Sequence, residues 1–254
     1  MSDDYIVQTQ GLSKNFKGFR ALTDVNLRVR RGTIHALIGP NGAGKTTCFN
    51  LITKFLAPSK GRVFYKDQEI TKLHPAEIAV LGMVRSFQIS AVFLNLTVLE
   101  NVRVAMQRKL GNSYHFWRSQ TLLRGLHERV SELLTAVGLA DYTDVPAVEL
   151  PYGRKRALEI ATTLALDPDV MLLDEPMAGM ATAEVSRISD LIKRVAVNRT
   201  VLMVEHNLSV VADLSDYITV LHNGVILAEG TYEQISKKPE VIEAYMGTGD
   251  AQPE

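Results

Sequence analysis

The chain has 254 residues, which is long enough to bury one α/β core with or without a smaller lobe. Its 28 acidic and 28 basic residues balance, so overall charge favours neither nucleic acid nor an anionic membrane surface as a partner. No apolar run approaches the roughly 18 residues of a spanning helix, and the acidic start at residues 1–4 does not resemble a signal peptide. We therefore expect a cytoplasmic protein that reaches a membrane only through protein contacts.

Two kinds of strand pattern follow in chain order. Residues 6–9 and 25–29 alternate as half-exposed strands do, which predicts a small antiparallel layer near the N-terminus. After them, short apolar runs rich in β-formers alternate with helical patterns, which predicts parallel strands joined by crossover helices. These pairs are 33–38 with a helix from Lys45, 170–173 with 183–195, and 200–204 with a segment from Leu208.

The middle of the chain follows a different pattern. Between Thr97 and about Leu166 no convincing strand occurs, and apolar side chains repeat at helical spacing. We therefore predict an α/β protein whose core, residues 1–88 and 166–254, contains a mostly parallel sheet and the N-terminal antiparallel β layer. Residues 89–165 are predicted to form an inserted α-helical subdomain.

A glycine-rich loop follows the predicted strand 33–38. Its glycines let successive backbone N–H groups point at phosphates, and the next helix adds the positive end of its dipole. Lys45 is predicted to reach the β- and γ-phosphates of ATP, Thr46 to hold Mg²⁺ and Thr47 to bond an α-phosphate oxygen. An accidental glycine-rich turn is disfavoured by the strand before the loop and the helix after it. The loop comprises Gly39, Pro40, Asn41, Gly42, Ala43, Gly44, Lys45 and Thr46, and it predicts a RecA-like P-loop NTPase core.

An acidic pair ends the predicted strand 170–173. Hydrolysis at a P-loop needs a carboxylate at the end of a neighbouring buried strand, where Mg²⁺ and the attacking water meet. Asp174 is predicted to hold Mg²⁺ through water, and Glu175 to polarise the attacking water. A solvated acidic pair is the alternative, and the P-loop upstream favours the catalytic interpretation.

A histidine follows the last of the predicted parallel strands, 200–204. His206 would stand at another strand end on the same rim of the sheet, from which it can contact the γ-phosphate. A lone histidine is more often structural, so the hypothesis depends on the position of His206 rather than on its residue type.

In their order along nearly the whole chain, these residues resemble the ATP-binding-cassette (ABC) ATPases. The resemblance implies that Phe16, in Ser-Lys-Asn-Phe, stacks on adenine, whereas a core phenylalanine is the alternative. It also implies that Gln88, in Arg-Ser-Phe-Gln, senses Mg²⁺ and water and relays their state to a membrane partner.

The segment 150–156 is similar to the signature of that family, commonly Leu-Ser-Gly-Gly-Gln, within the predicted helical subdomain. Gly153 keeps one glycine, so its N–H at a helix start can face the γ-phosphate of a partner subunit. Pro151 provides neither a hydroxyl nor an N–H, which leaves Tyr152, Gly153 and the helix dipole for this contact in trans. A weaker or asymmetric composite site is therefore expected, and a plain proline-started helix is the alternative.

A second departure from the family pattern is Ala181, where an aspartate or asparagine is usual, and it puts communication across the dimer in doubt. The segments 85–88, 93–102, 159–161, 176–180 and 241–247 look like the branched-chain amino-acid importer ATPases. That subgroup also serves urea, amide and aromatic-acid importers, and related ATPases drive lipopolysaccharide export.

The resemblance implies an ATP-hydrolysing motor subunit on the inner face of the plasma membrane. Its partners would be two membrane permeases, a second ATPase subunit in a head-to-tail dimer and a solute-binding protein, with no nucleic acid. An ATPase of a lipopolysaccharide-type exporter and a non-transport cassette ATPase remain alternatives. The second is disfavoured because this chain carries neither a second cassette nor a long coiled coil.

Overall fold

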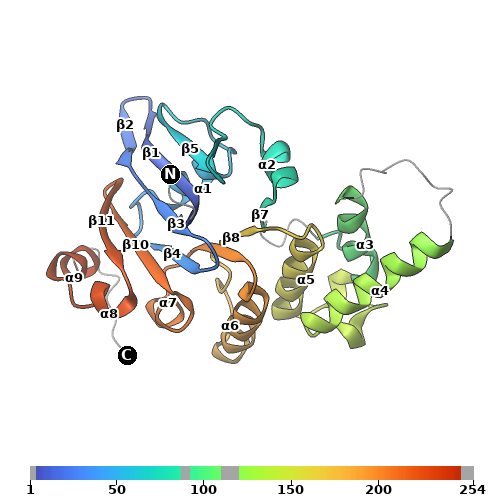
Figure 1. Ribbon diagram of the computed structural model, residues 1–254. Helices are drawn as coiled ribbons and strands as arrows, with labels where there is room; N and C mark the ends of the chain where they lie inside the picture. The colour runs from blue at the N-terminus through green and yellow to red at the C-terminus, as the bar shows by residue number, and fades with distance from the viewer. Residues whose placement is uncertain (1–3, 87–91, 110–119, 247–254) are drawn as a thin grey trace. The chain divides into compact units, whose positions relative to one another are not determined.

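The computed structural model describes residues 4–86, 92–109 and 120–246. The chain divides into two compact units, one of residues Met1–Leu81 with Val195–Glu254 and the other of Gly82–Arg194 (Figure 1). The predicted domain boundaries, 1–88 with 166–254 against 89–165, stay a prediction.

An antiparallel sheet forms one layer of the first unit. Its order is β2 (Phe19–Val25), β1 (Tyr5–Phe16), β5 (Lys60–Tyr65) and β6 (Gln68–Glu69), and β3 (Arg28–Arg30) also pairs with β1. The sequence predicted this antiparallel layer correctly, although its details differ.

The predicted alternation of residues 6–9 is wrong, because these residues are all buried. β1 is hydrogen bonded to β5 on one side and to β2 and β3 on the other, so it is the central strand of the layer. Thr9 tolerates burial because its hydroxyl donates to the Val25 carbonyl and accepts from the Leu27 N–H, each at 2.8 Å. The single strand expected at 25–29 is two strands, which are separated by residues 26–27.

A second group of strands in the first unit carries the glycine-rich loop. β4 (Ile34–Ile38) lies between the parallel strands β10 (Tyr217–His222) and β9 (Thr200–Val204), and β11 (Val225–Gly230) pairs antiparallel with β10. Every residue of β4 and β9 is buried, including His35 within β4. The helices of this unit are α1 (Lys45–Ile52), α2 (Pro75–Leu81), α7 (Leu208–Leu214), α8 (Tyr232–Ile235) and α9 (Pro239–Met246).

The second unit is mainly helical. The parallel strands β7 (Met83–Arg85) and β8 (Val170–Asp174) lie in it, and β8 is buried along its whole length. The helices α3 (Val98–Lys109), α4 (Gln120–Ala136) and α5 (Tyr152–Leu164) pack against one another, and α6 (Thr182–Ala196) begins in the same unit. Short 3-10 helices at Ala140–Tyr142 and Ala147–Glu149 connect α4 to α5. Parallel strands, an antiparallel layer and a helical region together confirm the predicted α/β class.

Within the described ranges, none of the helices has the length and apolar character that a membrane span requires.

Candidate functional site

The P-loop connects β4 to α1, and close backbone packing requires glycine at two of its positions. Gly39 has φ +149°, and a Cβ there would lie 2.1 Å from the carbonyl oxygen of Leu221. Gly44 has φ +101°, and a Cβ there would lie 2.8 Å from the carbonyl oxygen of Ala21. Because any side chain would clash, the path of this loop depends on its glycines.

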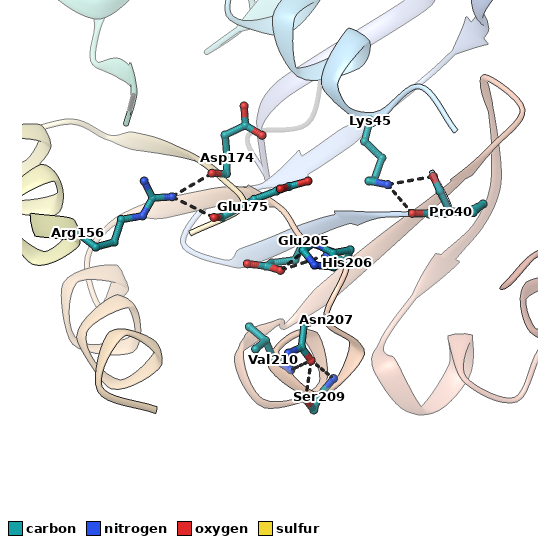
Figure 2. Close-up of polar contacts among 11 residues, drawn as sticks. Pro40, Lys45, Arg156, Asp174, Glu175, Glu205, His206, Asn207, Ser209 and Val210 are labelled. Carbon is teal, nitrogen blue, oxygen red and sulfur yellow. Dashed lines mark hydrogen bonds and ion pairs between the residues drawn. The ribbon is translucent and has the colours of Figure 1, made fainter. Parts of the chain in front are cut away.

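Lys45 is the first residue of α1, and its side chain is buried against the loop (Figure 2). Its ammonium group donates to the carbonyl oxygens of Gly39 at 2.5 Å and Pro40 at 3.0 Å. The N–H groups of a first helical turn have no acceptor within the helix, so this end of α1 can receive an anion. Thr46 is exposed in that turn and Thr47 is half-buried.

His206 lies two positions after the end of β9, and its side chain is 58% exposed (Figure 2). The buried Glu205 carboxylate accepts the backbone N–H of His206 at 3.1 Å and lies 3.9 Å from its Nδ1. Asn207 then caps α7 by accepting the N–H groups of Ser209 and Val210. The histidine is therefore held between a buried strand end and a capped helix, with its ring accessible.

Phe16, at the end of β1, is 43% exposed, and the Lys14 ammonium lies 5.2 Å from its ring centre. This exposure excludes the alternative that Phe16 is a core residue. The ring is accessible to a planar group, as stacking on adenine requires.

In the second unit, the acidic pair lies where β8 ends. Asp174 is the last residue of β8, and its Oδ2 lies 2.5 Å from Nη2 of Arg85 on β7. Both side chains are largely buried, at 11% and 16% exposure. Sequence analysis did not identify Arg85 as a partner of Asp174, and the only available signal was its position at the end of another strand.

Glu175 adopts φ +44°, a left-handed conformation that is costly for a residue with a side chain. Arg156, on α5, donates to the carbonyl oxygens of Asp174 at 3.0 Å and of Glu175 at 3.1 Å (Figure 2). It also donates to the carbonyl oxygen of Pro176 at 3.1 Å. A single guanidinium thus holds three successive carbonyl groups around the proposed catalytic glutamate.

Glu159 neutralises this buried guanidinium, with its Oε2 2.5 Å from Nη1 of Arg156. Burial raises the pKa of Glu159, while the charge and hydrogen bond of Arg156 act in the opposite direction. From the sequence, Arg156 was placed in the signature segment. Its bonds to the carbonyl groups of residues 174–176 were missed, because 18 to 20 positions separate these residues from Arg156.

The signature-like segment opens α5 with Pro151 as its N-cap, and no side chain caps the helix. α5 begins at Tyr152, four positions before the start expected from the sequence. A Cβ at Gly153 would lie 2.8 Å from a carboxylate oxygen of Glu184, so a negative charge already lies near this turn. A cavity of about 670 Å³ borders the turn, and its lining includes Pro151, Gly153, Glu184 and Arg187.

The structure places the predicted site residues in both units. The first unit contains Phe16, residues 39–47 and His206, and the second unit contains Pro151, Tyr152, Gly153, Asp174 and Glu175. Gln88 lies outside the described residues. In the described ranges, no group of three or more His, Cys, Asp or Glu side chains could hold a metal ion. The roles of the individual residues stay predictions.

Comparisons with known proteins agree over almost the full length of the chain. It is 38% identical over 249 residues to the high-affinity branched-chain amino acid transport ATP-binding protein LivG of Escherichia coli, covering 95% of this chain and 98% of LivG. It is also 38% identical to BraF of Pseudomonas aeruginosa, a protein with the same description, over 95% of this chain and 98% of BraF.

Solved structures of ATP-binding cassettes are also similar to this chain over almost its full length. A crystal structure of the ADP conformation of an ATP-binding cassette of an ABC transporter superposes with a TM-score of 0.84 at 30% identity, over 96% of this chain and 99% of that one. A nucleotide-free cassette gives a TM-score of 0.82 at 30% identity, over 95% and 98% of the two chains.

Two families match the sequence. Residues 22–178 match the ABC transporter family, and residues 225–251 match the branched-chain amino acid ATP-binding cassette transporter family. The chain therefore belongs to the ABC transporter ATPases, nucleotide-binding proteins whose general activity is ATP hydrolysis coupled to transport.

Proposed function

We propose that this chain is the motor subunit of an importer for branched-chain amino acids or a related small polar solute such as urea, an amide or an aromatic acid. The observation that carries the solute class is the full-length likeness to LivG and BraF. The match of residues 225–251 adds support, because it lies outside the part of the chain that matches the general ABC family.

The proposed chemistry starts with the phosphates of ATP at the P-loop. The ammonium of Lys45 exchanges its bonds to the Gly39 and Pro40 carbonyls for bonds to the β- and γ-phosphates. Thr47 bonds the α-phosphate, and Phe16 stacks on the adenine ring. These contacts orient the γ-phosphate for attack by water.

Glu175 then polarises the attacking water, and His206 contacts the γ-phosphate as charge moves onto it. Thr46, Asp174 and Gln88 are the proposed ligands of Mg²⁺, with Asp174 acting through water. The donors fit this ion, because the Thr46 hydroxyl and the Asp174 carboxylate are hard oxygen ligands and Thr46 is exposed. When bound, Mg²⁺ neutralises charge on the phosphates.

Hydrolysis is proposed to need a head-to-tail dimer, in which Pro151, Tyr152 and Gly153 face the nucleotide of the partner cassette. Pro151 gives this contact neither a hydroxyl nor an N–H, and the Glu184 carboxylate lies near Gly153. We therefore propose that the two nucleotide sites of the dimer are unequal and that the partner is a related but different cassette.

The complete transporter is proposed to contain two permeases and a solute-binding protein, with this chain peripheral on the inner face of the plasma membrane. The helical subdomain 89–165 is proposed to carry the signature segment.

Co-purification from membranes tests the proposal. We expect two permeases, a second cassette and a solute-binding protein, and the solute receptor should bind a branched-chain amino acid or one of the related solutes. Phosphate release should rise when this chain is mixed with the second cassette. Recovery with lipopolysaccharide-assembly proteins would instead identify an exporter, and full activity of this chain alone would contradict obligate pairing.

A further inference from the structure

One face of α5 holds the segment that follows β8. Tyr152 and Arg156 are four positions apart on this helix, so their side chains lie on the same face. The Tyr152 hydroxyl donates to the carbonyl oxygen of Ala178 at 2.9 Å. Arg156 donates to the carbonyl oxygens of residues 174, 175 and 176, so two side chains hold both ends of the segment 174–178.

The bonds made by Arg156 act on a strained part of the backbone. Glu175 has φ +44°, and a non-glycine residue persists there only when the surrounding structure determines its conformation. If the segment relaxed, the buried guanidinium of Arg156 would lose its three carbonyl acceptors and keep only Glu159 among the partners named here. Leaving donors of a buried charge unsatisfied is costly, so the bonds resist this relaxation.

The contact of Tyr152 has a different character. Its side chain is 41% exposed, and its hydroxyl bond is the only side-chain bond that it makes among the described residues. The usual family residue at this signature position is glycine, which could not make the bond. The tyrosine therefore adds a second attachment, beyond the one that Arg156 provides.

We propose that Arg156 and Tyr152, through their side chains, are positioning residues that set the direction of the Glu175 carboxylate. The inference rests on the proposed function, in which Glu175 polarises the attacking water. Neither side chain donates to a group that reacts, because four of their bonds end on backbone carbonyls and the fifth joins Arg156 to Glu159. Their effect on catalysis passes through Glu175.

Two conservative variants separate positioning from general stability. Arg156→Lys keeps the positive charge next to Glu159 but loses the planar fork that reaches three carbonyls. Tyr152→Phe removes one exposed hydroxyl and leaves the backbone N–H in place, so it should fold normally. Arg129→Lys is the matched control, because Arg129 pairs with Glu132 at the same i, i+3 spacing on α4 but at an exposed position.

The test measures ATP hydrolysis by the complex co-purified from membranes. We expect kcat to fall about 10-fold for Arg156→Lys and about 3-fold for Tyr152→Phe, with the KM for ATP changed less than about 2-fold, because small misplacement of a catalytic group costs rate rather than binding. Arg129→Lys should keep the wild-type kcat and KM.

The decisive comparison repeats both variants in a Glu175→Gln background, using single-turnover hydrolysis of radiolabelled ATP. If the two side chains act through Glu175, the residual rate should stay within about 2-fold of that of Glu175→Gln alone. An equal further loss in that background, or a rise in KM without a fall in kcat, would overturn the inference. If Arg156→Lys does not fold, Tyr152→Phe alone decides whether these side chains position Glu175.

The inference and the function on which it rests fail in different ways. Wild-type turnover by Glu175→Gln would remove Glu175 from the proposed mechanism and the positioning role with it. A slow Glu175→Gln enzyme in which Tyr152→Phe still lowers the rate 3-fold would overturn the positioning role alone.

Discussion

The P-loop and the segment after β8 are both attached to the end of a buried strand, but they are held in different ways. The P-loop is held by its own glycines and by Lys45, whose ammonium bonds two carbonyls of the same loop. The segment around Glu175 is held by Arg156 from another helix and by Arg85 from another strand. The first site is thus encoded in contiguous residues, whereas the second depends on side chains distant in the sequence.

The comparison predicts the largest effect at Glu175, because only this residue is proposed to act on the water. Glu175→Gln should slow hydrolysis by about 10²- to 10⁴-fold, the usual contribution of general acid–base catalysis. ATP affinity should change less than about 2-fold. Phosphate release and equilibrium ATP binding measure the two effects, and retained turnover would exclude Glu175 from the mechanism.

Lys45 should affect binding and turnover together, in contrast to Glu175. Lys45→Ala removes a charge-assisted contact worth about 1.5–3 kcal/mol, so the Kd for ATP should rise by roughly 10- to 100-fold. Titration with a fluorescent ATP analogue measures this change. Lys60→Ala, at an exposed position of β5, is the control, and equal weakening by both variants would contradict a specific phosphate contact.

His35, on the strand that precedes the P-loop, should make the free energy of unfolding depend on pH in the acid range. Burial lowers the pKa of His35, on β4, from 6.5 to about 4, so the unfolded chain binds this proton more readily than the folded chain does. Its contribution to stability is complete above pH 6.5 and is lost as the pH falls toward 4.

Denaturant unfolding at a series of pH values tests this prediction. Between pH 6.5 and 5, the free energy of unfolding should fall by about 1–2 kcal/mol because of His35 alone. This component should disappear in His35→Gln and persist in His127→Gln, where the histidine is exposed. An unchanged pH dependence in His35→Gln would show that other groups cause the loss.

The smallest effect is expected at Arg85, which pairs with Asp174 in the segment after β8. Arg85→Gln removes the cation that competes with Mg²⁺ for the largely buried Asp174 carboxylate, which should leave this carboxylate more available to the metal ion. The Mg²⁺ concentration for half-maximal ATP binding should therefore fall by about 2- to 5-fold. A higher Mg²⁺ requirement would mean that Arg85 orients Asp174 rather than competing for it.

Sequence analysis was most successful where structure follows from contiguous residues. The strands β8 and β9 and the start of α1 fall within one residue of their predicted bounds, because uninterrupted apolar runs and the glycine-rich loop mark them directly. The burial of residues 6–9 of β1 was not predicted, because both faces of a strand are covered only when other parts of the chain pack against it. Arg85 and Arg156 were missed for the same reason, since both bonds join parts of the chain that only the fold brings together.

Our central proposal is that the P-loop and the Asp174–Glu175 segment act on the same nucleotide. A crystal structure of the Glu175→Gln variant with ATP and Mg²⁺ tests it most directly. We expect one ATP whose phosphates contact Lys45 and whose Mg²⁺ lies next to Asp174 with water between them. An ATP bound at Lys45 with Asp174 still paired to Arg85 and no metal beside it would contradict the claim.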